Sequence, residues 1–149
     1  MEKFEKAKSW FETAQKNGVP FSKFTLLYIS YEILYKSLHR KHLQFNEDYK
    51  TKFSEVVESH KKIFFQFQEY IKYKEINPGF IDNLEPGKGK SNAKYEDLEN
   101  IQQYLHCIFV IRNNFIHGDK SSENTQDIRL VSFATQSLEV FLSNLFKKN

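Results

Sequence analysis

Apolar residues recur along most of this chain at spacings of three and four, which is the period of one face of an α-helix. The pattern predicts helices over residues 2–17 and 22–42. It continues over residues 46–74, where the sequence leaves open whether one helix or two are formed. Two more helices are expected over about 95–117 and 124–147. The periodicity therefore predicts an all-α fold.

One segment breaks the helical pattern. Residues 77–94 read NPGFIDNLEPGKGKSNAK and hold two Pro-Gly pairs with few apolar side chains, which predicts a long surface loop. The whole chain has 149 residues, of which 40% are hydrophobic, and this suits one ordinary domain with a real core. We therefore expect a single domain over residues 1–149, built as an up-and-down bundle of four to five helices.

Charge and composition narrow the class of protein. A formal net charge of +3 is too small for a protein that coats nucleic acid, so any such contact should be a local patch. The single cysteine, Cys107, cannot form an internal disulfide, and the N-terminus shows no signal-peptide pattern. The longest apolar runs, such as CIFVI, fall far short of the roughly 18 residues that span a bilayer. A cytoplasmic protein without membrane contact is expected.

Candidate chemistry lies at the end of the most apolar predicted helix, where residues 111–120 read IRNNFIHGDK. Asn113 and His117 fall on one polar stripe of that helix. With Gly118 as the residue that ends the helix, His117 occupies the last turn, where the helix dipole favours a protonated imidazole. Such a histidine suits acid–base work near neutral pH. Arg112 lies ~140° around the helix from His117, so the two converge only on a shared ligand or across a symmetric interface.

The segment RNNFIHG resembles the signature of the HEPN family, small helical domains with an R-x(4–6)-H motif. It is especially similar to the R-N-x-x-x-H-G form of the Apea-like branch of that family. The aromatic-rich LLYISYEILY of the second predicted helix is similar to an early helix of such domains. The position of the motif at the end of the penultimate helix also fits an HEPN-like bundle.

The resemblance implies a metal-independent endoribonuclease that works as a homodimer, with two motifs facing one cleft. His117 would be the general base for the ribose 2′-hydroxyl or the acid for the leaving 5′-oxygen. Arg112 would stabilise the charge that develops on the phosphorus centre, and Asn113 would orient the imidazole or bind a phosphate oxygen. RNA would be the substrate, with no cofactor and no metal ion.

The resemblance also implies a toxin or antiviral-defence role, with an antitoxin or another defence-system protein as a further partner. Some toxin members carry a tyrosine two residues after the histidine, which a partner nucleotidyltransferase modifies. Asp119 stands at that position here. Regulation by that route is therefore not expected.

The motif residues also have a purely structural interpretation. His117 and Asn113 fit solvated residues at a helix end, and Arg112 fits an ion pair with Glu32 or Glu139 inside the bundle. The protein would then be a catalytically silent helical module that binds a nucleotide or a protein partner through the same cleft. Both interpretations keep the same fold.

Two other residues of the motif helix suggest chemistry that their spacing does not support. Cys107 lies ~15 Å along the helix from His117, which is too far for a thiol–imidazole pair. His106 has no further Cys or His at a zinc spacing. We therefore expect Cys107 to be a core residue, and we expect no metal site.

Basic residues in two places are candidate RNA contacts. Arg40 and Lys41 close the second predicted helix, where positive charge equally complements the helix dipole. Lys88, Lys90 and Lys94 lie on the predicted loop, where they could contact phosphates or serve only as solvated surface charge. The sequence does not decide between these roles.

Overall fold

The computed structural model describes residues 2–41, 47–74, 101–116 and 125–147 of the chain. Within these ranges every regular element is a helix and no strand occurs, so the prediction of an all-α fold is confirmed. The six described helices are α1 (Glu2–Gln15), α2 (Pro20–Lys41), α3 (Glu47–Ser59), α4 (Lys61–Lys74), α6 (Ile101–Ile116) and α7 (Thr125–Lys147).

The predicted helix boundaries agree closely with the observed ones. Those of α1, α2 and α7 differ from the predictions by at most two residues. The predicted surface loop at 77–94 lies outside the described residues, as do residues 95–100 of the predicted motif helix. These parts of the sequence interpretation stay predictions.

The predicted stretch 46–74 forms two helices, α3 and α4, which meet at His60. The His60 amide donates to the carbonyl oxygens of Val56 and Val57, at 3.0 and 3.2 Å, and these bonds close α3. The His60 carbonyl accepts from the amide of Phe64 at 3.2 Å, and this bond opens α4. This division is one reason why the described residues hold six helices instead of the four to five that we expected.

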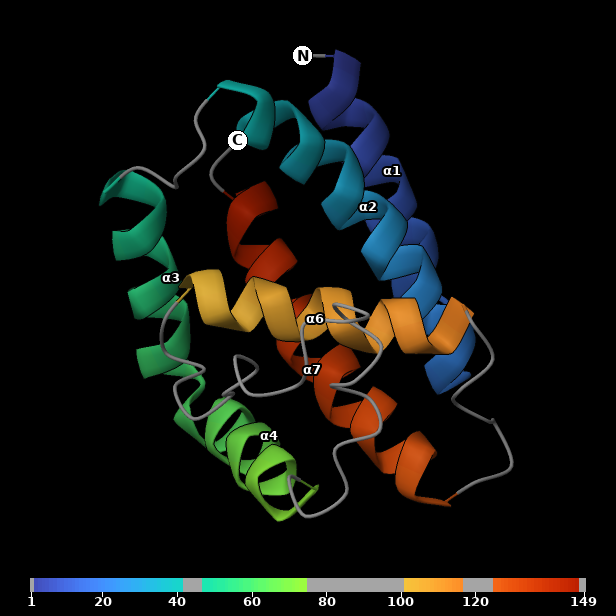
Figure 1. The fold of residues 1–149 in the computed structure, drawn as a ribbon. Helices are drawn as coiled ribbons and strands as arrows, with labels where there is room; N and C mark the ends of the chain where they lie inside the picture. Colours follow the sequence, from blue (N-terminus) through green and yellow to red (C-terminus); the bar gives the residue numbers. More distant parts are fainter. Residues whose placement is uncertain (1, 42–46, 75–100, 117–124, 148–149) are drawn as a thin grey trace, which may run out of the picture.

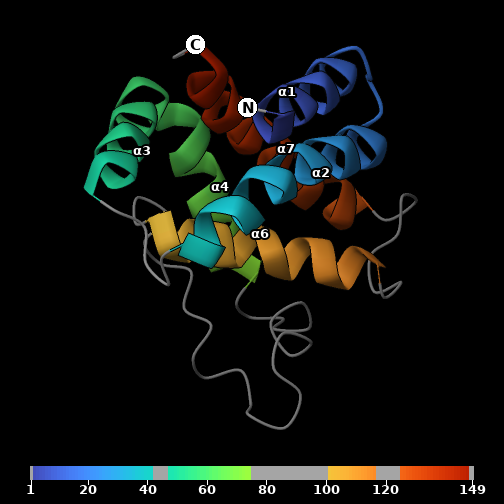
Figure 2. The ribbon, with the colours of Figure 1, turned by 90° about the horizontal axis from the view of Figure 1, so that it is seen from above.

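The described helices gather around α7 (Figure 1). α1 lies alongside α2, α2 packs against α7, and α3 and α4 pack against α7 as well. α6 runs across α7 instead of alongside it (Figure 1), and the view in Figure 2 places α6 along one edge of the packed helices. A crossing helix contacts several neighbours at once, which suits the broad apolar face of α6. This crossing departs from a simple up-and-down alignment.

Small side chains bring α1 and α2 close together. Ala7 and Ala14 on α1 are fully buried, and so is Ser30 on α2. The Ser30 hydroxyl donates to the Ala7 carbonyl oxygen at 2.6 Å, so its polar group is satisfied within the interface. These contacts hold α2 against α1. The position of α2 matters because its Tyr28 contacts Arg112 of α6.

A buried hydrogen-bond chain joins α6 to α7. The Tyr104 hydroxyl lies 2.8 Å from Ser137 Oγ, and the Ser137 hydroxyl donates to the Ala134 carbonyl oxygen at 2.9 Å. Because a serine hydroxyl has one hydrogen to donate, Tyr104 must be the donor toward Ser137. Tyr104 and Ser137 are both fully buried, so the Tyr104 hydroxyl depends on Ser137 for its hydrogen bond, whereas Ser137 also bonds to Ala134.

The Tyr104 ring also connects three other helices. Its centroid lies 5.2 Å from that of Phe53 on α3, 5.5 Å from that of Phe64 on α4 and 5.9 Å from that of Phe141 on α7. These separations are within the range of favourable aromatic pairs. Tyr104 thus fixes the first turn of α6 onto the core, and through the helix it also helps to set the position of the motif at the other end.

Candidate functional site

The described residues include one side chain of the predicted catalytic set. Arg112 lies in α6 and its side chain is described. Asn113 belongs to the same helix, but its side chain lies outside the description. His117 follows Ile116, the last described residue of α6, and lies outside the described residues. The geometry of the site is therefore built from Arg112 and its surroundings.

The Arg112 guanidinium lies over an aromatic ring. Its central carbon is 5.2 Å from the ring centroid of Tyr28 on α2, which is within the range of a cation–π interaction. Arg112 is half-buried, whereas Tyr28 is buried. A cation–π contact uses none of the N–H donors of a guanidinium, so these donors stay available for other partners. Arg112 is thus held at a partly open surface with donors suited to an anion.

The proposed ion pair of Arg112 with a carboxylate is not seen among the described residues. Glu139, one of the two candidates, lies 3.0 Å from Lys23. The contact that Arg112 makes within the described part of the chain is the one with Tyr28. Sequence reasoning missed Tyr28 as the partner of Arg112, although the aromatic-rich LLYISYEILY segment that contains it was a visible signal.

The side chains of the candidate RNA contacts lie outside the described part of the structure. Arg40 and Lys41 belong to the last turn of α2, but their side chains lie outside the description. Lys88, Lys90 and Lys94 lie in the undescribed segment between α4 and α6. Their roles in RNA binding stay predictions.

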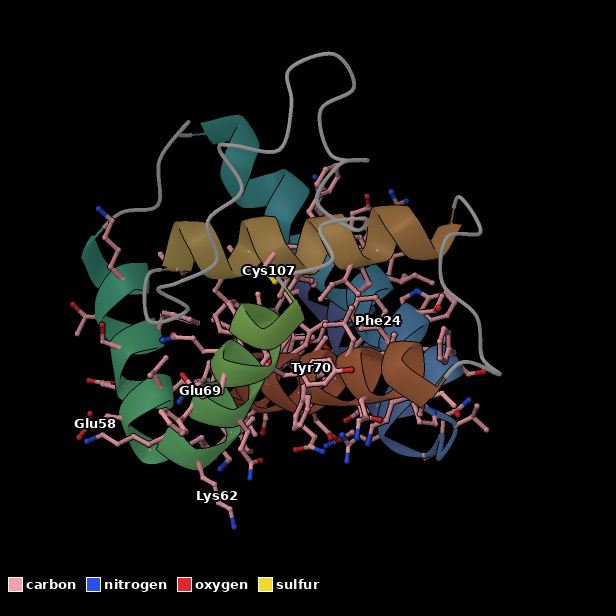
Figure 3. The ribbon with its side chains drawn as sticks, turned by 60° about the horizontal axis from the view of Figure 1, so that its bottom comes forward. Phe24, Glu58, Lys62, Glu69, Tyr70 and Cys107 are labelled. Atoms are coloured by element: carbon pink, nitrogen blue, oxygen red, sulfur yellow. The ribbon has the colours of Figure 1, made fainter. Side chains whose placement is uncertain are left out.

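Cys107 is a core residue, as predicted. It is a free cysteine without exposed surface, and Figure 3 shows its side chain on the side of α6 that faces the other helices. Burial raises the pKa of the Cys107 thiol well above its ordinary value of 9.0. Burial likewise raises the pKa of Tyr104 above 10.0, and the hydrogen bond to Ser137 offsets only part of that rise. Neither group is prepared to ionise near neutral pH.

These two raised pKa values predict that the protein loses stability in alkali. In the folded state both groups keep their protons, whereas in the unfolded chain they ionise near 9.0 and 10.0. Stability is therefore unaffected by these groups below about pH 9 and falls as the pH rises further. Each group should contribute a slope of about 1.4 kcal/mol per pH unit once its unfolded form is ionised. Urea unfolding between pH 8 and pH 11 measures this slope.

A matched variant isolates the cysteine contribution. Cys107→Ala removes one titrating group and leaves all tyrosines and lysines unchanged. Its stability should therefore fall less steeply above pH 9 than that of the wild type, by about one proton per molecule. Equal slopes for the two proteins would show that Cys107 ionises as readily when folded as when unfolded.

A hollow lies at the corner between α3 and α4, with a volume of about 250 Å³. Phe65 on its edge is 62% exposed, whereas its neighbour Phe64 is buried, because successive side chains of a helix point ~100° apart. Glu58 and Lys61 pair across the rim at 2.9 Å, and both are exposed, so their pairing contributes little stability. The lining residues are Val57, Glu58, Lys61, Phe64, Phe65 and Gln68. Sequence reasoning did not single out this corner.

Neither a membrane span nor a metal-binding cluster is found in the described part of the chain. No described helix combines the length and the apolar character needed to cross a bilayer. Over the same residues, no three or more His, Cys, Asp or Glu side chains come together as a metal-binding group.

Comparisons with known proteins give no match for this chain. The chain matches no protein-family model, no curated protein and no solved structure. The resemblance to HEPN domains therefore rests on the RNNFIHG segment, its position in the chain and the aromatic-rich LLYISYEILY segment.

Proposed function

We propose that this protein is a metal-independent endoribonuclease with an HEPN-like helical bundle, in which Arg112, Asn113 and His117 act on RNA. The observation that carries the proposal is the environment of Arg112. Arg112 is half-buried, its guanidinium carbon lies over the Tyr28 ring, and no ion pair joins it to a carboxylate among the described residues. An arginine held in this way, five residues before a histidine, is suited to a phosphodiester.

The proposed reaction uses the neighbouring 2′-hydroxyl of RNA as the nucleophile. His117 removes the proton from that hydroxyl, whose oxygen attacks phosphorus while the bond to the 5′-oxygen breaks, and the leaving 5′-oxygen takes up a proton from water. The attack is intramolecular and gains from proximity. Arg112 stabilises the negative charge that grows on the phosphoryl oxygens, and Asn113 orients the imidazole or binds one of those oxygens. The products are a 2′,3′-cyclic phosphate and a 5′-hydroxyl.

The purified protein is expected to cut an RNA oligonucleotide in excess EDTA. The same oligonucleotide with a single 2′-deoxy nucleotide at the scissile position should survive, because it lacks the nucleophile. Mass spectrometry of the fragments should show the cyclic phosphate. Cutting of the deoxy substrate, or activity that EDTA abolishes and magnesium restores, would contradict this mechanism. Absence of cutting of any RNA would favour the silent binding module instead.

The proposed enzyme is a homodimer whose two motif helices face one cleft. Phe109 supports this arrangement, because it lies three residues before Arg112 on α6 and is 39% exposed. Residues three apart are neighbours on a helix surface, so an apolar side chain lies beside the candidate catalytic arginine. A second copy of the chain would cover it.

Phe109→Glu is therefore expected to convert the dimer into a monomer, because a charge would be buried at the centre of the interface. Sedimentation at micromolar concentration measures the change. Phe65→Glu is the matched control, since Phe65 is also an exposed aromatic residue but lies on α4. It should leave the dimer intact. A wild-type protein that sediments as a monomer would remove the basis for a composite site.

A further inference from the structure

We propose that Tyr28 is the positioning residue for Arg112, and this inference rests on the proposed ribonuclease function. The ring of Tyr28 is the described surface on which the guanidinium lies, at 5.2 Å from the centroid. Tyr28 belongs to α2, and Arg112 lies near the end of α6, 84 positions later in the chain. The contact thus fixes the reactive end of α6 relative to another helix.

The Tyr28 ring is itself held in place. It is only 6% exposed, and the Tyr31 ring meets it edge-on at 5.3 Å. Phe24, labelled in Figure 3, lies 6.3 Å from it on the other side along the helix and is fully buried. Since α2 is also packed against α1 and α7, this row of rings has little freedom to move. A rigid ring restricts the conformations that the long side chain of Arg112 can adopt.

An aromatic ring suits the role of a partner for Arg112 better than a carboxylate does. A carboxylate would use the N–H donors of Arg112 and cancel its charge, whereas a cation–π contact does neither. The charge and the donors stay available for phosphoryl oxygens. A cation–π contact is also stronger where water is excluded, as it is on the buried ring of Tyr28.

Three variants test the proposal through the rate of RNA cleavage. Tyr28→Leu removes the ring and keeps an apolar side chain, so it should lower kcat about tenfold with a smaller change in KM. Tyr28→Phe keeps the ring and should restore most of that rate. Phe24→Leu is the control, because Phe24 belongs to the same row of rings. It should lose stability without a comparable loss of kcat.

Combining the change with Arg112→Ala separates positioning from a general structural effect. If Tyr28 acts through Arg112, then Tyr28→Leu should cause no further loss of kcat in the Arg112→Ala background. A tenfold loss in both backgrounds would overturn the proposal. So would a Tyr28→Leu protein as active as the wild type. Should Tyr28→Leu fail to fold, Tyr28→Met removes the ring with a more adaptable side chain.

A measurement without substrate distinguishes failure of this inference from failure of the proposed function. The chain has three arginines, so the Nε–H signal of Arg112 can be assigned by NMR from its disappearance in Arg112→Lys. In the wild type and in Tyr28→Phe this signal should be shifted upfield by the ring, and in Tyr28→Leu the shift should vanish. If the shift vanishes in Tyr28→Leu but the wild type cuts no RNA, the contact between Tyr28 and Arg112 is supported and the ribonuclease function is refuted. If the wild type cuts RNA but the Arg112 signal is the same in wild type and in Tyr28→Leu, the positioning role of Tyr28 is refuted.

Discussion

Alanine at either Arg112 or His117 is expected to lower the rate of RNA cleavage by at least ~100-fold, in line with loss of a charge stabiliser or of an acid–base group. His117→Ala removes the group that takes the 2′-hydroxyl proton. Arg112→Ala removes the positive charge next to the phosphoryl oxygens. Initial rates with a fluorescent RNA oligonucleotide measure both effects.

Thermal stability separates this result from unfolding. A histidine at a helix end makes few core contacts, so His117→Ala should melt near the wild-type temperature. Arg112→Ala loses the cation–π contact with Tyr28 and should be destabilised modestly. Arg129→Ala is the matched control, because Arg129 is an exposed arginine on α7 and should be dispensable for cleavage. A collapse of the melting temperature in His117→Ala would favour the structural interpretation of the motif.

The largest loss of stability is expected at Tyr104, outside the motif. Tyr104→Ala should lower the free energy of unfolding by about 3–5 kcal/mol, as for other large aromatic residues in a core. The reason is that its ring contacts α3, α4 and α7 at once, so truncation leaves a cavity bordered by three helices. Such a loss is a large part of the total stability of a domain of this size. Urea denaturation followed by circular dichroism measures it.

Smaller changes at the same place test the direction of the hydrogen bond. Tyr104→Phe removes one buried hydrogen bond and should cost about 1 kcal/mol, because Ser137 still donates to Ala134. Ser137→Ala leaves the buried Tyr104 hydroxyl without its acceptor and should cost more, about 1–3 kcal/mol. A larger cost for Tyr104→Phe than for Ser137→Ala would mean that the donor has been assigned wrongly.

The sequence alone determined the helices and the candidate chemistry. Helix formation depends on bonds between residues four apart and on a local apolar period, so the ends of α1, α2 and α7 could be predicted closely. The burial of Cys107 followed from the same pattern. The RNNFIHG motif is also local, and its interpretation needed no contact with another helix.

Only the tertiary structure decided which distant residues meet. Tyr28 and Arg112 are 84 positions apart, and Tyr104 and Ser137 are 33 apart. An apolar period shows that a helix buries one face, but it does not show which helix covers that face or at what angle. The crossing of α6 over α7 and the division of 46–74 at His60 depend on such packing. For this reason the sequence predicted an arginine in need of a partner, and the packed helices supplied an aromatic ring.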